Sequence, residues 1–198
     1  MAYGPWSNNR TYLGRESTAG TAVAATDVLR VPFSMISDER DRKIIDEQIG
    51  AFMQAERSYD ASLLAKYAMP STELTFEQIC HIFEAGIKTA TPTGSGPYVY
   101  VYNFPYSGTS VNTIKTYTIE TGSATITGDA REMEYSFVED FEISGKFGEA
   151  WMMKANWVGR QQSAPITMTA GLTAPTVEAA IFQKTALTID ATGGTIST

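Results

Sequence analysis

The sequence has little of the chemistry that most enzymes and metalloproteins use. Its 198 residues contain one cysteine, Cys80, and one histidine, His81. A single cysteine excludes an intrachain disulfide and a cysteine-rich zinc site, and a single histidine excludes a multi-histidine metal site. The two residues are neighbours on an expected helix, so their side chains point in different directions and cannot form a thiolate–imidazolium pair.

Long apolar runs and excess positive charge are absent as well. The apolar runs are too short for a membrane-spanning helix, and the first ten residues lack the basic and apolar regions of a secretory signal peptide. The formal net charge of −7 argues against a protein held on nucleic acid by phosphate contacts. No Gly-X-Ser-X-Gly motif occurs, and Gly94-Ser95-Gly96 precedes a strand, as a turn does, instead of opening a helix. We therefore expect a non-enzyme without catalytic residues, cofactor or metal.

One amphipathic helix is predicted over residues 75–86. Thr75 and Gln78 form a capping-box pair, and Gly86 is placed to end the helix. An apolar stripe recurs at helical spacing and consists of Phe76, Ile79, Cys80, Phe83 and Ile87. We expect this helix to cover one face of a sheet. Cys80 is expected to fill the core, and His81 to be a surface or hydrogen-bonded polar residue.

Strand patterns dominate the chain from residue 97 onward. Shorter strands are predicted at 98–102, 114–121 and 124–127, and the strongest pattern covers 131–160. Its odd positions are apolar, at Met133, Tyr135, Phe137, Phe141 and Ile143, and its even positions are mostly polar or acidic. Glu139 interrupts the apolar face, which predicts a bulge near 138–140. A turn at 145–148 and a second strand at 150–159 complete a long hairpin, with Trp151, Met153, Ala155 and Trp157 on its core side.

The other face of this hairpin is acidic. Between Glu132 and Glu149 the chain has six acids and one base. Four of the acids share the even positions of one strand: Glu132, Glu134, Asp140 and Glu142. A glycosidase pair or a divalent-cation site would need carboxylates that converge, whereas this spacing makes a charged wall. A solvated sheet face is the simplest interpretation.

Three further segments are ambiguous. Residues 1–33 are rich in Gly, Ala and Thr and predict an extended arm that becomes ordered on a partner surface, or else a partly disordered terminus. Residues 38–47 interleave charges of both signs, and apolar residues at helical spacing up to Met53 favour a short helix there. Residues 164–198 are Thr- and Ala-rich, with a strand expected at 187–190 and a turn at Gly193-Gly194. The unfinished strand pattern predicts a second module in a longer chain.

Several of these segments together resemble the major tail proteins of long-tailed, siphovirus-type bacteriophages. The likeness rests on the arm from Leu13-Gly14-Arg15-Glu16-Ser17 to Ala25, the helix from Leu74 to Gly86, and the hairpin from Asp140-Phe141-Glu142 to Gly159-Arg160. It covers most of the chain and is a likeness of pattern, without a sharp motif.

The resemblance implies a mainly β fold: a β-sandwich or barrel-forming sheets with a long hairpin and one flanking helix. It divides the chain into an N-terminal arm (1–33), a tail tube domain (34–163) and C-terminal strands (164–198). In the family the segment corresponding to 34–56 is commonly a loop and strand that bridges subunits, which conflicts with the short helix. We leave that conflict open.

The resemblance also implies a structural virion protein that assembles in the host cytoplasm into stacked rings. The rings are hexameric, or trimeric and pseudo-hexameric if the chain is longer, and DNA passes through them without specific binding. Tape measure and tail terminator proteins are the implied partners, and no membrane is involved. The acidic face is then expected to line the lumen, and the inter-ring arm would contact a neighbour through its apolar residues, which are Leu13, Val23, Val28, Leu29, Val31 and Phe33. The alternatives are another ring-forming tail or secretion-tube component, or a monomeric β-sandwich binding module.

Overall fold

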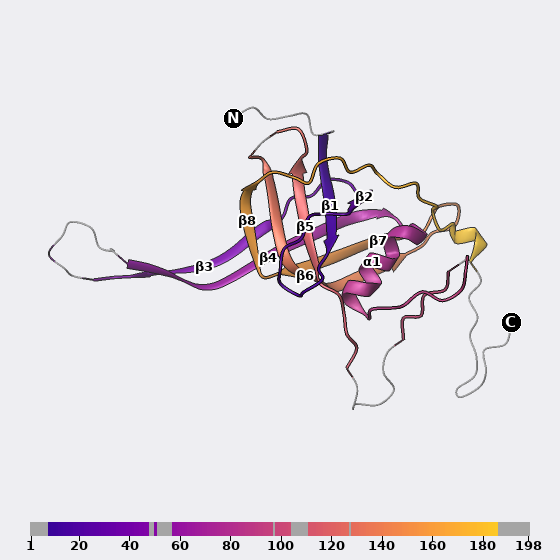
Figure 1. Ribbon diagram of the computed structural model, residues 1–198, viewed down its shortest axis with the longest axis horizontal. Helices are drawn as coiled ribbons and strands as arrows, with labels where there is room; N and C mark the ends of the chain where they lie inside the picture. The colour runs from indigo at the N-terminus through magenta and orange to yellow at the C-terminus, as the bar shows by residue number, and fades with distance from the viewer. Residues whose placement is uncertain are drawn as a thin grey trace.

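The computed structural model describes residues 8–47, 50, 57–96, 98–103, 111–126 and 128–185. These residues form one body from which a two-stranded hairpin projects (Figure 1). Within the described ranges, no helix combines the length and the apolar character that crossing a membrane requires. The fold is mainly β with one flanking helix, as the sequence predicts.

In the described part of the chain, eight antiparallel strands and one α-helix make up the fold. The strands follow the order β2-β1-β5-β6-β7-β4-β3, and β8 also pairs with β6. Their bounds are β1 Asn9–Arg15, β2 Asp27–Leu29, β3 Ser37–Ile45, β4 Arg57–Glu73, β5 Tyr117–Ser123, β6 Ala130–Ser144, β7 Met152–Gly159 and β8 Gln161–Ile166. Helix α1 spans Phe76–Gly86, and a short 3-10 turn spans Phe182–Lys184.

Strand β6 is shared by two layers. Its first part pairs with β5 and β8, and from Phe137 it pairs with β7. The β5–β6 register shifts around Tyr135, whose φ of 55° lies in a region that non-glycine residues rarely occupy. We call β2, β1, β5, β8 and the first part of β6 sheet A, and we call the rest of β6 with β7, β4 and β3 sheet B. The bend at Tyr135 separates the two sheets.

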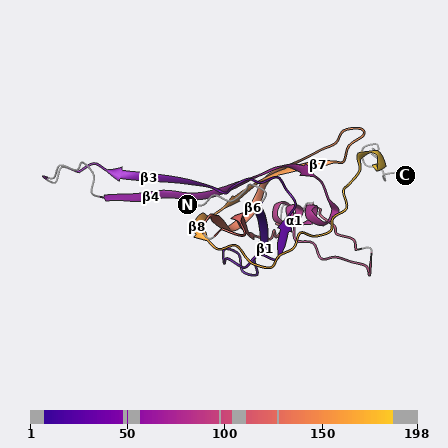
Figure 2. The same ribbon diagram turned by 90° about the horizontal axis from the view of Figure 1, so that it is seen from above.

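The core fills the space between sheet A, sheet B and α1. Trp157, Tyr67 and Tyr117 are its largest fully buried side chains, and Tyr117 and Trp157 meet edge to face with ring centroids 5.8 Å apart. The hydroxyls of Thr11 and Tyr67 lie 3.3 Å apart and join the two sheets. Figure 2 shows these layers edge-on, with β7 and β4 on one side and α1 and β1 on the other.

The predicted β6–β7 hairpin is confirmed. The register shifts between Val138 and Asp140, where the bulge was expected, and Met153, Ala155 and Trp157 face the core. The expected strict alternation along β6 is wrong, because the irregularity at Tyr135 changes which side faces inward. Ser136 and Val138 are buried, Phe137 is half-buried and Tyr135 is 42% exposed.

The predicted helix is confirmed over residues 76–86, but its expected buried stripe is only partly correct, since Ile79 alone of that stripe is among the side chains that pack against the core. Gln78, Ile82 and Ala85 face the core, whereas Phe76 is 57% exposed and Cys80 is half-buried. Thr75 precedes the helix without a capping hydrogen bond from its side chain to the backbone. The buried side of the helix therefore differs from the side that the apolar pattern predicts. Tertiary packing buries the small Ala85 against the sheet, and the larger side chains line a cleft that is described below.

The short helix expected over 38–53 is wrong for its described part. Residues 37–45 form β3, which pairs with β4 as a long ribbon that leaves the body (Figures 1 and 2). Residues 48, 49 and 51–56 lie outside the described residues. Cross-strand ion pairs replace the helical contacts, since Asp60 binds both Arg40 and Arg42.

Three smaller strand predictions need correction. Residues 98–102 form only an isolated bridge, between Val99 and Thr93, and residues 124–126 form bends after β5. The strand expected at 114–121 exists but runs over 117–123. The predicted boundary at residue 164 falls inside β8, and the strand expected at 187–190 lies outside the described residues.

Candidate assembly surface

Sheet B presents a broad face to solvent, on the side away from the core. Lys154 and Asn156 of β7 point outward there, because Met153, Ala155 and Trp157 point inward. Strand pairing and ion pairs place more acidic than basic side chains on this outer face. The acids are Glu39, Asp41, Glu73, Glu139, Asp140 and Glu142, and the bases are Lys43, Arg57, Lys66 and Lys154. The face is therefore polar and carries a net negative charge.

Both edges of sheet B lack a strand partner within the described part of the chain. The β3 edge pairs only with β4, and β6 from Phe137 to Ser144 pairs only with β7. An unpaired strand edge offers backbone N–H and C=O groups to another chain. The β6 edge carries Glu139, Asp140 and Glu142 without a cation, while β3 carries both acids and bases.

The structure divides the four acids that the sequence places on one face. Asp140 and Glu142 lie on the outer face of sheet B, where Asn156 Nδ2 donates to Asp140 at 3.0 Å and Lys154 Nζ lies 2.8 Å from Glu142. The hydrogen bond with Glu142 raises the pKa of Lys154. Glu132 lies in sheet A, beyond the bend in β6, so the expectation of one continuous acidic face is wrong.

Glu134 also belongs to this sheet A group and is not solvated. Its side chain is only 14% exposed and is paired with the Arg160 guanidinium, and Gln161 Nε2 donates to it at 3.1 Å. Arg160 also donates to the carbonyl oxygen of Gly20 at 3.3 Å. Glu134 therefore holds neighbouring segments together, and we remove it from the predicted lumen-lining set.

Glu132 is an acid whose environment opposes its ionisation. Burial raises the pKa of this carboxyl, and the neighbouring Glu120, Glu134 and Glu16 raise it further. The folded protein therefore holds this proton to a higher pH than the unfolded chain, so stability falls as pH rises from the ordinary glutamate pKa through the raised one.

Replacing Glu132 by glutamine is expected to raise the melting temperature at neutral pH, because the penalty for the partly buried charge disappears. The gain should vanish below the ordinary glutamate pKa, where the carboxyl is protonated in both states. Thermal unfolding followed by circular dichroism over a pH series measures this. Glu149→Gln, at an exposed turn, is the control. Equal melting temperatures of wild type and Glu132→Gln at neutral pH would contradict this assignment.

The expected N-terminal arm is wrong for its described residues, which are part of the body. Strand β1 lies between β2 and β5 of the same chain, and Leu13, Val28 and Leu29 are buried. Val23, Val31 and Phe33 are half-buried on the same body. Residues 1–7 lie outside the described residues. The long pairing of β1 with β5, from Asn9 to Arg15, supplies the partner surface that the sequence interpretation assigned to another subunit.

A buried carboxylate in this segment escaped the sequence interpretation. Glu16 is 1% exposed and accepts hydrogen bonds from the backbone N–H groups of Gly20 and Tyr135 and from the hydroxyls of Thr116 and Thr118. The four distances lie between 2.6 and 3.1 Å. Glu16 thus ties the segment after β1 to β5 and to the bend of β6. No local pattern marks it, because three of its four partners come from two distant segments, at 116–118 and at Tyr135.

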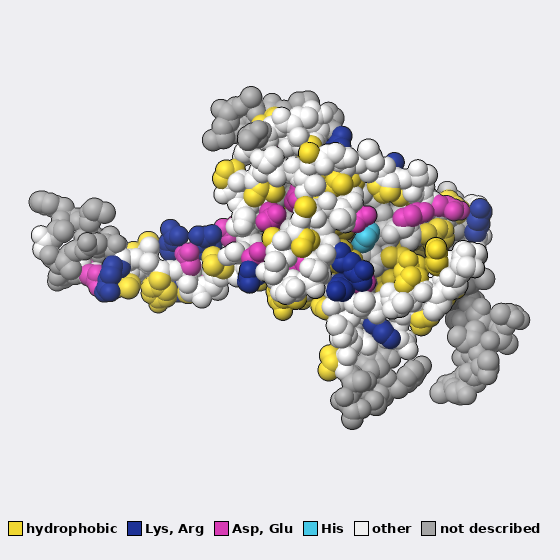
Figure 3. All heavy atoms as spheres, viewed as in Figure 1, with side chains coloured by type: hydrophobic (Ala, Val, Ile, Leu, Met, Phe, Trp, Pro, Cys, Tyr) yellow, Lys and Arg dark blue, Asp and Glu magenta, His cyan; other side chains and the backbone are white. Residues whose placement is uncertain are grey.

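An aromatic cleft of about 950 Å³ opens beside α1. Figure 3 shows hydrophobic side chains gathered on this face. At its base Tyr117 donates to Glu84 at 2.8 Å, and Glu84 is also paired with Arg15. His81 Nδ1 lies 3.3 Å from the Tyr117 hydroxyl, and burial lowers the pKa of this histidine. The walls of the cleft include six further residues: Phe76, Glu77, Cys80, Phe83, Tyr98 and Tyr100.

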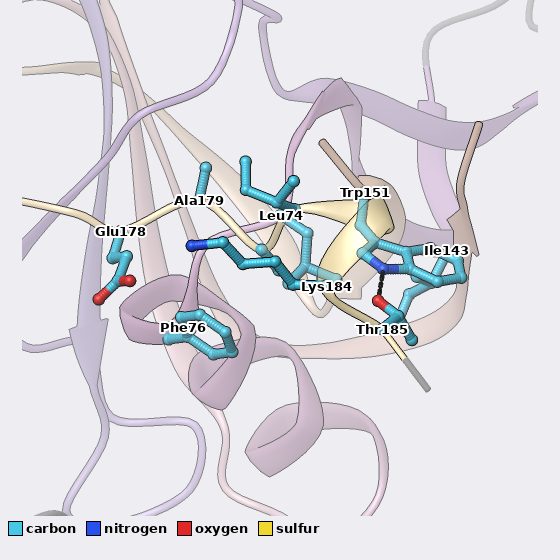
Figure 4. Close-up of a pocket in the computed structure, with 10 residues that line it drawn as sticks. Leu74, Phe76, Ile143, Trp151, Glu178, Ala179, Lys184 and Thr185 are labelled. Carbon is cyan, nitrogen blue, oxygen red and sulfur yellow. Dashed lines mark hydrogen bonds between the residues drawn. The ribbon is translucent and has the colours of Figure 1, made fainter. Parts of the chain in front are cut away.

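A second, smaller cavity of about 420 Å³ lies where residues 178–182 cross between the end of β4 and the β6–β7 turn. Figure 4 shows Leu74, Phe76, Ile143 and Trp151 around it. The Trp151 indole donates to Thr185 Oγ1 at 2.7 Å. The cavity is mostly apolar, and Trp151 also packs on Phe182 with ring centroids 4.8 Å apart. We interpret it as an apolar hollow at the edge of the core, because the exposed side chains of Phe76 and Ile181 form part of its lining.

The polar groups at the base of the aromatic cleft are engaged with one another, since His81 lies beside the Tyr117 hydroxyl and Tyr117 donates to Glu84. Among the residues that the structure describes, no group of three or more His, Cys, Asp or Glu side chains could hold a metal ion. Cys80 is half-buried in the aromatic cleft rather than in the core, and burial raises the pKa of its thiol. The sequence matches no protein-family model, and no curated protein sequence matches it significantly.

Proposed function

We propose that this protein is a structural subunit of a bacteriophage tail tube, which assembles into stacked rings around a DNA channel. The observation that carries the proposal is sheet B, a four-stranded antiparallel sheet with two unpartnered edges, a core-facing side and a polar, net negative outer side. Copies that join edge to edge close a ring of sheets, and full closure removes exposed edges. The resemblance of the sequence to major tail proteins supports the same assembly.

Charge supports a specific pairing of edges. The β6 edge carries three carboxylates at Glu139, Asp140 and Glu142 and no cation, whereas β3 carries equal numbers of acids and bases. Like charges directly opposite each other destabilise paired strands, so two β6 edges should not meet. We therefore expect β6 of one copy to meet the net neutral β3 of the next. Such head-to-tail contacts form a ring if the rotation closes.

The projecting hairpin supports assembly independently. Residues Ser37 to Lys43 of β3 and Arg57 to Leu63 of β4 are solvent-exposed in one copy, and Ile44 is 68% and Tyr59 55% exposed. A two-stranded hairpin alone in water is only marginally stable. Its ion pairs are exposed and each contributes at most about 1 kcal/mol. A neighbouring copy would supply the packing that this ribbon lacks.

The outer face of sheet B would then line the channel. A positively charged lumen would bind phosphates and retain the DNA, whereas a net negative one lets it slide. Asp140→Lys together with Glu142→Lys should leave the fold intact, because both side chains are exposed. Assembled tubes of this double variant should retain short duplex DNA at low salt, and the retention should fall as salt rises.

The control for the charge-reversal experiment is Glu149→Lys together with Glu178→Lys, which changes the same number of charges at exposed positions off that face. Filter retention of labelled DNA by the purified tubes measures the difference. Tubes of the Asp140/Glu142 double variant that retain no more DNA than the control would remove these residues from the channel wall.

One observation favours a second candidate, a monomeric β-sandwich binding module. Such a module needs exposed aromatic side chains in a concave surface, and the cleft beside α1 has Phe76, Tyr98 and Tyr100 in that position. Sedimentation velocity over a range of concentrations separates the two. The tube subunit forms rings or longer polymers as concentration rises, whereas the binding module stays monomeric.

A further inference from the structure

We infer that the aromatic cleft beside α1 receives the projecting β3–β4 hairpin of a second copy of this chain. The inference rests on the proposed ring assembly and assigns the cleft a specific occupant. Its first support is position. The cleft lies next to the β6 edge, since Phe83 lines the cleft and contacts Phe141 of β6 with ring centroids 5.4 Å apart. A hairpin joined to that edge would therefore lie along the cleft.

The sides of the hairpin supply the second support. Strand pairing places Ile44, Leu63 and Arg40 on the same side of the ribbon as Ala65, which faces the core. Helix α1 lies on this core side of sheet B as well, because Ile82 and Ala85 pack into the common core. When two copies of sheet B join edge to edge, the core side of one continues into the core side of the next. Ile44 and Leu63 would then face the neighbour's cleft.

The chemistry of the two surfaces is complementary. Ile44 and Leu63 are 68% and 40% exposed, and Phe76, Tyr98 and Tyr100 in the cleft are 57%, 63% and 43% exposed. Burying such apolar surfaces against each other is favourable by about 25 cal/mol per Å².

The arginine side chains point the same way. On the hairpin, Arg40 binds both Asp38 and Asp60, and Arg42 binds Asp60 as well. The cleft contains three acids and one arginine: Asp27, Glu77, Glu84 and Arg15. Arginine also stacks favourably on aromatic faces. A second copy of the chain therefore fits this cleft through apolar contact and through arginine side chains that can stack on its aromatic faces.

The position of the chain's one cysteine allows a direct test, because Cys80 lines the cleft. The full-length Ile44→Cys variant places a second thiol on the hairpin side that should face it. Oxidation with copper–phenanthroline under mildly alkaline conditions should then link residue 44 of one copy to Cys80 of the next. Each copy then carries both thiols, so head-to-tail linkage continues from copy to copy and gives a ladder of covalent oligomers on a non-reducing gel. Mass spectrometry identifies the linked peptides.

Two variants are matched controls. Lys43→Cys lies one residue away on the opposite side of the same ribbon, so it should link to Cys80 several-fold more slowly. Ile44→Cys together with Cys80→Ser leaves one thiol per chain and should stop at covalent dimers. Sedimentation of every variant before oxidation is measured in parallel.

Rapid linkage of position 44 to Cys80, compared with position 43, supports the inference. Variants that assemble but link at equal rates from both positions would overturn the assignment of the cleft and leave the ring proposal standing. Variants and wild type that remain monomeric would overturn both. Binding of an added sugar to the cleft of a monomer would identify the binding module instead and would likewise overturn this inference.

Discussion

Replacing Glu16 by alanine is expected to lower the free energy of unfolding by more than about 3 kcal/mol. The carboxylate is buried and accepts hydrogen bonds from two backbone N–H groups and two hydroxyls. Alanine leaves those donors without their acceptor, and an unsatisfied buried donor costs about 1–3 kcal/mol. One of the donors is the N–H of Tyr135, whose positive φ is itself unfavourable. Chemical denaturation of the full chain measures the change.

The controls for Glu16 separate its hydrogen bonds from its charge. Glu16→Gln keeps the size of the side chain but places an amide N–H₂ group among donors, so it should also destabilise, though by less than alanine. Glu149→Ala removes an exposed carboxylate and should change the free energy of unfolding by less than about 0.5 kcal/mol. Glu16→Ala with a free energy of unfolding close to that of Glu149→Ala would show that Glu16 does not hold the bend between the two sheets.

Shortening the β3–β4 hairpin is expected to abolish assembly without unfolding the body. Asp41 and Ser62 lie opposite each other, so residues 42–61 can be replaced by Asn-Gly, which favours a two-residue hairpin turn. The described residues that are removed do not contribute to the buried core. Sedimentation velocity should show a monomer at concentrations where the wild type forms rings or polymers.

Two comparisons make the shortened variant interpretable. Its near-ultraviolet circular dichroism should match that of the wild type, because Tyr67 and Trp157 remain buried. Val111→Ser removes an apolar side chain that is 92% exposed and does not belong to the hairpin, and this variant should assemble normally. A shortened variant that sediments like the wild type would show that the hairpin is not needed for assembly.

The sequence predicts those parts of the fold where one local pattern agrees with the final packing. The β6–β7 hairpin is such a case, because Met153, Ala155 and Trp157 alternate with polar residues and all face one core. The helix at 76–86 is another in its extent. Its buried side could not be predicted, because the cleft leaves Phe76 exposed while the sheet buries Gln78.

The remaining errors have a common physical cause, which is pairing between segments far apart in the chain. Strand β1 is Gly- and Thr-containing and looks like an arm, yet its pairing with β5 buries Leu13. The β3 segment has charges that suit a solvated helix or strand equally, and only its pairing with β4 decides between them. At the bend, the backbone N–H of Tyr135 donates to Glu16, more than a hundred residues away in the sequence. Local periodicity places four acids on one face, but the bend leaves Glu132 and Glu134 in sheet A and Asp140 and Glu142 in sheet B.

Electron cryomicroscopy of the assembled full-length protein tests the central claim most directly. The account predicts stacked rings with an open channel, in which β6 of each copy meets β3 of the next and Asp140 and Glu142 face the lumen. The same reconstruction should show the hairpin of one copy against α1 of its neighbour. Particles that remain single copies at every protein concentration and salt, or assemblies that leave both edges of sheet B exposed, would contradict it.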